Sequence, residues 1–236
     1  LQAKNLNPEH KPIPIEMHLR LLGEQPAEVT LRGAVRVNKQ TQKVNLDELL
    51  VGIGGATTMP MQIQTSGSID LSRETADLKL KFQSGETHGT GSLHYANAGS
   101  PRIKANLQLN LLDETLLALT GVEAAAAAGK GPTGGDEALP LGAMRLIDTE
   151  VVLDIASAHF GDHTVNNLHV KLRALKGLIN ATDMTGNLHG GKLVGSGSLD
   201  GRKKIVTINT EGRIARVDIA SALATTNSAP KLSGSA

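Results

Sequence analysis

Polar and apolar residues alternate along much of this chain, and this period of two is the feature that most limits its fold. In segment 165–174 (VNNLHVKLRA) the leucines, a valine and an alanine occupy even-numbered positions from 168 on, whereas the basic residues are odd-numbered. Segment 102–109 (RIKANLQL) has the same pattern. Successive side chains of a β-strand point to opposite faces of the sheet. Both segments are therefore predicted to be strands with one apolar and one polar face.

The same alternation predicts further strands at 29–37, 61–71, 76–83, 151–156 and 205–210. Turn-rich stretches, NAGSP at 97–101 and DGRKK at 200–204, separate neighbouring strands. Because successive strands are close in sequence, an antiparallel meander is the simplest topology. We expect an all-β fold with a few short helices: an elongated, curved antiparallel sheet that forms a groove.

The apolar composition is almost entirely aliphatic. Residues of the hydrophobic class make up 39% of the chain, but aromatic residues make up only 1%. Aromatic rings contribute much of the burial energy in cores and ligand pockets. A thin, repetitive aliphatic surface is therefore expected in place of a compact cavity, and we expect no enzyme, no catalytic residues and no cofactor.

Glycine is dense in segment 186–201 (GNLHGGKLVGSGSLDG), but its spacing is wrong for a nucleotide site. A turn and another strand follow these glycines, whereas a phosphate site needs a helix N-terminus there. The stretch AGKGPT at 128–133 also departs from the phosphate-loop pattern, with Ala124 at the first glycine position and Gly131 at the hydroxyl position. Glycine inside a strand indicates sharp bending or a surface kept clear of side chains.

Charge and ligand chemistry exclude several other classes. The chain has 24 basic and 23 acidic residues, without a basic stripe, which argues against a nucleic-acid partner. It has no cysteine, so disulfides and cysteine-based metal sites are excluded. One set of candidate metal ligands surrounds the sequence HFGDH: His159, Asp162, His163 and His169. We interpret HFGDH as a turn between strands with solvated side chains, and expect no metal site.

The chain divides into two parts that resemble each other. We predict an N-terminal β-groove part (1–122), a flexible Ala/Gly/Pro loop (123–138) and a C-terminal β part (139–236) that ends within a further repeat. GTGSLHY at 89–95 and GSGSLDG at 195–201 are each followed by an alternating strand, an aspartate and a short apolar run. Asp113 and Asp218 occupy the N-cap positions of the expected helices. Such strand-strand-helix units are typical of architectures that extend by stacking.

A third, weaker match to this repeat is VNLDELL at 44–50. It fits either a repeat copy or a strand with a bulge.

Residues 139–224 resemble the C-terminal part of AsmA-like proteins of Gram-negative bacteria. The resemblance rests on ordered motifs: LPL (139–141), VNNLHVKLRALKGLIN (165–180), MTGNLHGG (184–191), KLVGSGSLDG (192–201) and RVDIASAL (216–223). His189 stands where the family usually has Tyr, and 218–223 is richer in Ala than is usual there. The N-terminal stretch from PIPIEMHLRL onward resembles the preceding β-rich part of such proteins more loosely.

This resemblance, to a family that includes relatives such as TamB, implies a function. It implies a periplasmic segment of a protein anchored in the inner membrane by an N-terminal helix that the chain lacks. It also implies binding of phospholipid acyl chains in a β-groove, in support of lipid transport and outer-membrane biogenesis. The alternative is a non-catalytic periplasmic scaffold whose sheet edges recruit outer-membrane assembly proteins.

The groove-lining candidates are apolar residues of the alternating strands. They could equally form a closed core under the short helices, because the alternation shows only which residues share a face. The candidates are Leu107, Leu109, Leu168, Val170, Leu172, Leu193, Val206 and Ile208.

Overall fold

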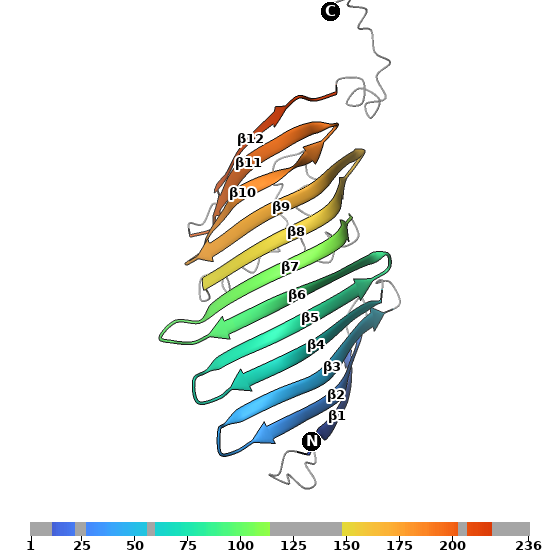
Figure 1. Ribbon diagram of the computed structural model, residues 1–236, viewed down its shortest axis with the longest axis vertical. Helices are drawn as coiled ribbons and strands as arrows, with labels where there is room; N and C mark the ends of the chain where they lie inside the picture. The colour runs from blue at the N-terminus through green and yellow to red at the C-terminus, as the bar shows by residue number, and fades with distance from the viewer. Residues whose placement is uncertain (1–10, 22–26, 56–59, 114–147, 203–206, 219–236) are drawn as a thin grey trace, which may run out of the picture.

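A computed structural model describes residues 11–21, 27–55, 60–113, 148–202 and 207–218, and most of them belong to one open, curved β-sheet (Figure 1). The sheet has twelve strands that lie side by side in chain order. The strands are β1 (Ile13–Leu21), β2 (Ala27–Asn38), β3 (Lys43–Gly55), β4 (Met61–Asp70), β5 (Thr75–Ser84), β6 (Thr87–Ala96), β7 (Arg102–Leu112), β8 (Asp148–Phe160), β9 (His163–Leu175), β10 (Leu178–Leu188), β11 (Gly191–Asp200) and β12 (Thr207–Ala215).

Neighbouring strands are antiparallel with one exception, so the expected meander is correct apart from a single pair. Strands β7 and β8 run parallel, with Arg102 beside Asp148 and Leu109 beside Ile155. A parallel neighbour requires the chain to return to the same end of the sheet, which a short hairpin turn cannot do. The residues between Asp113 and Asp148 supply that length. The sheet therefore continues from the N-terminal part into the C-terminal part, while the predicted loop 123–138 lies outside the described residues.

The alternating segments are strands, as predicted, and most are longer than the pattern indicated. Of the segment 205–210, residues 207–210 belong to β12, and residues 205 and 206 lie outside the described residues. The 44–50 match is a strand with a bulge, since the pairing of β3 with β4 shifts between Leu46 and Leu49. The described part of the chain contains no helix; the segments after Asp113 and Asp218, where helices were expected, lie outside it.

The register places apolar residues of successive strands in rows on one face. One row near the parallel junction runs from Leu107 through Leu153 to Val170. An adjacent row runs from Leu109 through Ile155 to Leu168. The opposite face carries the charged and amide side chains of the same strands. This is the two-faced sheet that a period of two produces.

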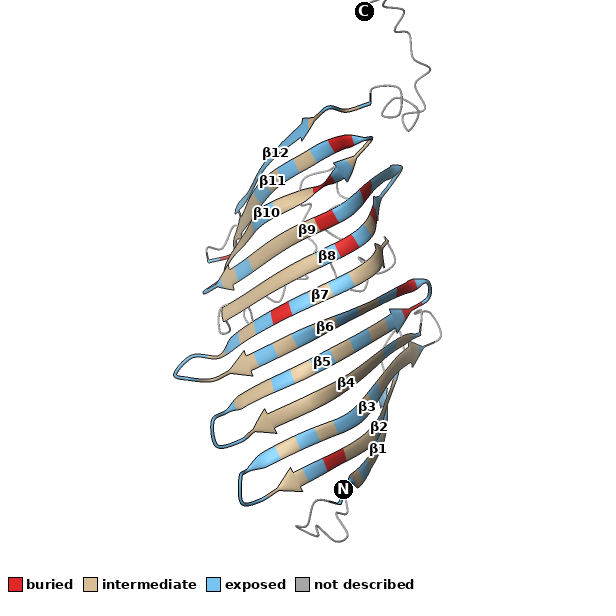
Figure 2. Cartoon of the chain, viewed as in Figure 1, coloured by how far each residue is buried: buried red, intermediate tan, exposed pale blue. Residues whose placement is uncertain are grey.

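Burial is shallow over most of this sheet (Figure 2). The hydrophobic residues that are buried are few: Val35, Ala105, Ile155, Ala158, Val165 and Leu168. Four of them, in β8 and β9, form one cluster, with partly buried neighbours such as Leu112, Leu153 and Leu188 packed against it. Most of the remaining apolar face is half-buried, as in Leu78 and Leu80 of β5, and it becomes exposed at the two ends of the sheet, as at Leu19 and Ile208.

Hairpin turns at the sheet ends are connected to one another by backbone hydrogen bonds. The amide of Leu71 donates to the carbonyl of Gln42 (2.9 Å), and the amide of Asn97 donates to the carbonyl of Glu74 (3.1 Å). Both acceptors have left-handed backbones, with φ of 50° and 52°. The carbonyl of His189 (φ 48°) accepts from Asp218 in the same way (2.9 Å). The same geometry therefore recurs at three places at the ends of the strands and connects segments that are far apart in the chain.

No helix among the described residues has the length and apolar character of a membrane-spanning segment.

Candidate functional site: the apolar face of the sheet

The predicted lining residues lie on one face, as far as the structure describes them. The pairings Gly91–Leu107, Leu153–Val170 and Leu172–Ala181 place candidates of β7 and β9 in rows of the apolar face. Leu193 and Ile208 continue the face into β11 and β12, through the pairings Gly186–Leu193 and Leu199–Ile208. Val206 lies outside the described residues.

Exposure of these residues varies strongly along the face. Leu168 is only 7% exposed, within the cluster on β8 and β9, whereas Ile208 in β12 is 61% exposed. Leu107, Val170 and Leu193 are half-buried. The face thus combines a small closed core with a wider area of partly exposed aliphatic side chains.

The apolar face carries no formal charge at its paired positions. In the described rows from Ile13–Val35 to Leu193–Ile214, no paired residue of this face is Asp, Glu, Lys or Arg. Its polar members are mostly hydroxyl side chains, among them Thr65, whose Oγ1 is buried without a hydrogen-bond partner. Leaving a hydroxyl unpartnered costs free energy. This face is therefore suited to contacts with aliphatic groups and poorly suited to binding a charged or strongly polar ligand.

Glycines of this face lie beneath the side chains of neighbouring strands. A Cβ added to Gly91 would be 2.5 Å from Cδ2 of Leu107, and one added to Gly195 would be 2.5 Å from Cε of Met184. The expectation that such glycines keep the surface clear of side chains is wrong at these positions, because adjacent strands fill the space. Large and small residues instead interlock across the strands, which gives a continuous aliphatic layer.

The opposite face is held in register by exposed cross-strand ion pairs. Arg32 Nε lies 3.2 Å from Glu16 Oε1, and Lys171 Nζ lies 3.6 Å from Glu150 Oε1. Each such exposed pair contributes at most about 1 kcal/mol. The polar face therefore differs from the apolar face chiefly in carrying these exposed charges.

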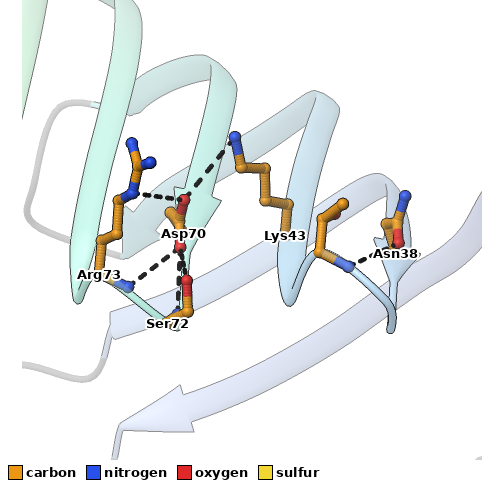
Figure 3. A network of polar contacts seen from close by, with 6 residues as sticks. Asn38, Lys43, Asp70, Ser72 and Arg73 are labelled. Carbon is orange, nitrogen blue, oxygen red and sulfur yellow. Dashed lines mark hydrogen bonds and ion pairs between the residues drawn. The ribbon is translucent and has the colours of Figure 1, made fainter.

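One carboxylate of this face, Asp70, lies where the β2–β3 and β4–β5 turns meet and contacts residues of both hairpins (Figure 3). Its Oδ1 accepts hydrogen bonds from the Ser72 hydroxyl (2.6 Å) and from the Ser72 and Arg73 amides (3.1 and 3.0 Å). Its Oδ2 lies 3.7 Å from Lys43 Nζ. The Ser72 hydroxyl is the main cause that lowers the pKa of Asp70 below its ordinary value of 3.8; the Arg73 amide and the two cations lower it further, while burial opposes them.

The four candidate metal ligands around HFGDH do not meet at one point in the structure. Gly161 and Asp162 form the turn between β8 and β9, as predicted. His169 Nδ1 lies 2.6 Å from Asp154 Oδ1 on the polar face, whereas His163 contacts His189. The described residues include no group of three or more His, Asp or Glu side chains placed to share a metal ion. His189 was not among the sequence-based candidates, because it is 26 positions from His163 in the chain and only the fold brings their two turns together.

The sequence-based list of lining residues also omitted the N-terminal half of the face. Ile15 of β1, Val51 of β3 and Phe82 of β5 occupy the same face through the antiparallel pairings of β1 to β5. The alternation in 76–83 already contained this signal for Phe82. The candidate site is therefore longer than the sequence-based list, and it extends over the whole described sheet.

Comparison of the chain with models of protein families, with curated proteins and with solved structures finds no match.

Proposed function

We propose that this chain binds the acyl chains of phospholipids on the apolar face of its sheet and supports their transport. The observation that carries the proposal is the continuity of that face: it is uncharged at its paired positions from β1 to β12, and most of it is only half-buried. A sheet with one apolar face normally buries it against another layer. Large exposed apolar surfaces are typical of contacts with other molecules or membranes.

The aliphatic character of the face supports a lipid in preference to a defined small molecule. Burying one methylene is worth about 0.8 kcal/mol, so a chain of about sixteen carbons needs about 13 kcal/mol of contact to remain out of water. A single deep pocket would hold such a chain in one place. On successive equivalent rows of Leu, Ile and Val, an acyl chain that moves loses contacts with one row and gains similar contacts with the next. Its movement along the sheet therefore costs little free energy.

The location and remaining partners in this proposal come from the resemblance to AsmA-like proteins. They are a periplasmic position, attachment to the inner membrane by an N-terminal helix, and a part in outer-membrane biogenesis. The role is non-catalytic and uses no cofactor. The uncharged rows of the apolar face are compatible with it, since a phospholipid headgroup would remain in water beside them.

Two measurements test the proposal: whether the chain carries bound lipid, and which face of the sheet the lipid contacts. We expect phospholipid to co-purify with the chain and to be detected by native mass spectrometry and by solvent extraction. A photoreactive phospholipid should label residues of the apolar face. Leu172→Gln, on that face of β9, should reduce labelling severalfold, whereas Arg173→Gln, one residue away on the polar face, should leave it unchanged.

Circular dichroism and urea denaturation would verify that both variants fold. A chain that binds no lipid, or that is labelled equally on both faces, would contradict the proposal.

A scaffold remains the second candidate, and one observation favours it. Strands β1 and β12 each pair with a described neighbour on one side only, so each presents a sheet edge. Unpaired edges are templates for added strands. Lipid-free chains that still capture an extended peptide at β12 would favour this function over the first.

A further inference from the structure

Two histidines from neighbouring hairpin turns meet at one end of the sheet. His163 begins β9, and His189 lies in the turn between β10 and β11. Nδ1 of His163 and Nε2 of His189 share a hydrogen bond of 3.1 Å, and the planes of the two rings are nearly perpendicular, at 86°. A metal ion bound by both nitrogens would take the place of the proton that they share. The residues are separated by 26 positions in the chain and lie at the protein surface. The pair therefore depends on the packing of two hairpins and is accessible to ions in solution.

The distance between these nitrogens matches that between two ligands of one metal ion. Imidazole nitrogens bind Zn²⁺ at about 2.0–2.1 Å, so two of them are about 2.9–3.4 Å apart when the angle at the metal lies between 90° and tetrahedral. We propose that His163 and His189 together bind a divalent transition metal ion that prefers imidazole, of the Zn²⁺, Ni²⁺ or Cu²⁺ class. Water completes the coordination, since the described residues supply no third converging side chain.

The two histidines lie beside an irregular part of the pairing between β9 and β10. The pairing of β10 with β9 is irregular between Thr182 and Thr185 and again between Thr185 and Asn187. It resumes at Asn187–Asn166 and Leu188–Val165, and this last pair lies within two residues of each histidine in the chain. The backbone of His189 is held in the left-handed region, with its carbonyl bonded to the Asp218 amide. An ion shared by the two rings therefore joins β9 and β10 just beyond their weakest stretch of pairing.

The measurement is a titration of the 236-residue chain, without a polyhistidine tag, with ZnCl₂ and NiCl₂ by isothermal titration calorimetry. We expect one saturable site per chain. Either His163→Ala or His189→Ala should weaken binding about tenfold or more, because each removes one of two protein ligands. His169→Ala is the matched control: it removes another surface histidine, paired with Asp154, and should leave the affinity unchanged.

Hydrogen exchange supplies an independent readout. Zn²⁺ should slow amide exchange in 185–188 of the wild-type chain but not in the His189→Ala variant, whereas Mg²⁺, which prefers oxygen ligands, should have no effect. Circular dichroism would verify the fold of each variant. Absence of saturable binding, or equal affinity in both histidine variants and the wild-type chain, would overturn the proposal. It is independent of lipid binding, so failure of either leaves the other standing.

Discussion

Leu107 of β7 lies directly opposite Gly91 of β6, and its Cδ2 occupies the space that a β-carbon on that glycine would need. The same position would be 2.7 Å from the carbonyl oxygen of Asn106, which belongs to the backbone and cannot rotate away. Glycine at position 91 therefore allows β6 and β7 to approach beneath a large aliphatic side chain. The arrangement shows that the glycine-rich strands are part of the packed layer.

Gly91→Ala should destabilise the sheet by about 1–3 kcal/mol, because overpacking forces backbone shifts. Urea denaturation followed by circular dichroism measures the change. Gly54→Ala is the matched control, since a β-carbon there meets nothing within 4 Å. We expect it to change stability by about 0.5 kcal/mol or less. Equal losses in the two variants would show that the contact with Leu107 is unimportant.

Gln42→Gly should stabilise the chain. Gln42 has a φ of 50°, and a left-handed backbone costs a residue with a side chain roughly 1–2 kcal/mol. Glycine removes that cost but adds about 0.5–1 kcal/mol of unfolded-state entropy, which leaves a net gain of about 0.5–1 kcal/mol. The hydrogen bond from Leu71 is made to the backbone carbonyl and is retained.

The midpoint of urea unfolding measures this gain. Gln40→Gly, in the same exposed turn but without a positive φ, is the control and should be neutral or destabilising. A gain of the same size at position 40 would argue against backbone strain as the cause.

Reversing one charge at the parallel pair of β7 and β8 should lower the stability of the sheet, and reversing the opposite charge as well should restore it. Arg102 of β7 pairs in register with Asp148 of β8, and both line a shallow hollow of the polar face. Asp148→Arg places two cations side by side and should cost about 0.2–1 kcal/mol. The double variant with Arg102→Asp should recover most of this loss. Thermal denaturation of all four chains gives the coupling free energy, which a salt concentration of about 1 M should largely abolish.

Asp70→Asn should lower stability at neutral pH and weaken the dependence of stability on acid. The pKa of Asp70 is lowered in the folded chain, chiefly by the Ser72 hydroxyl, so folding favours the ionised carboxylate. Its contribution is full above the ordinary value of 3.8, decreases as pH falls below it, and is lost below the lowered folded-state pKa. Melting temperatures of both chains should therefore converge at the acid end of a titration from neutral pH to about pH 2.

Ser72→Ala, which removes the hydroxyl that lowers the pKa of Asp70 most, is the companion variant and should weaken the same pH dependence in part. If the melting temperatures of Asp70→Asn and the wild-type chain differed by the same amount at every pH, the charge of the Asp70 carboxylate would not contribute to stability.

The strands and their faces could be predicted from local pattern because side-chain direction in a strand follows from the position in the chain alone. Segments 102–109 and 165–174 have the alternation, and the register places their apolar residues in shared rows. Hairpin turns such as Lys176–Gly177, with φ of 50° and 85°, have less distinctive sequences, so strand ends were harder to place.

Other features depend on contacts between residues far apart in the chain. Alternation cannot distinguish an antiparallel from a parallel neighbour, and the parallel pairing of β7 with β8 arises only when the chain returns across the sheet. The contact of His163 with His189, and the filling of the space above Gly91 by Leu107, likewise require two strands in one register. Side-chain periodicity is a property of one strand, and so it determined the two faces; the order, direction and register of strands are properties of the assembled sheet, and only the tertiary structure decided them.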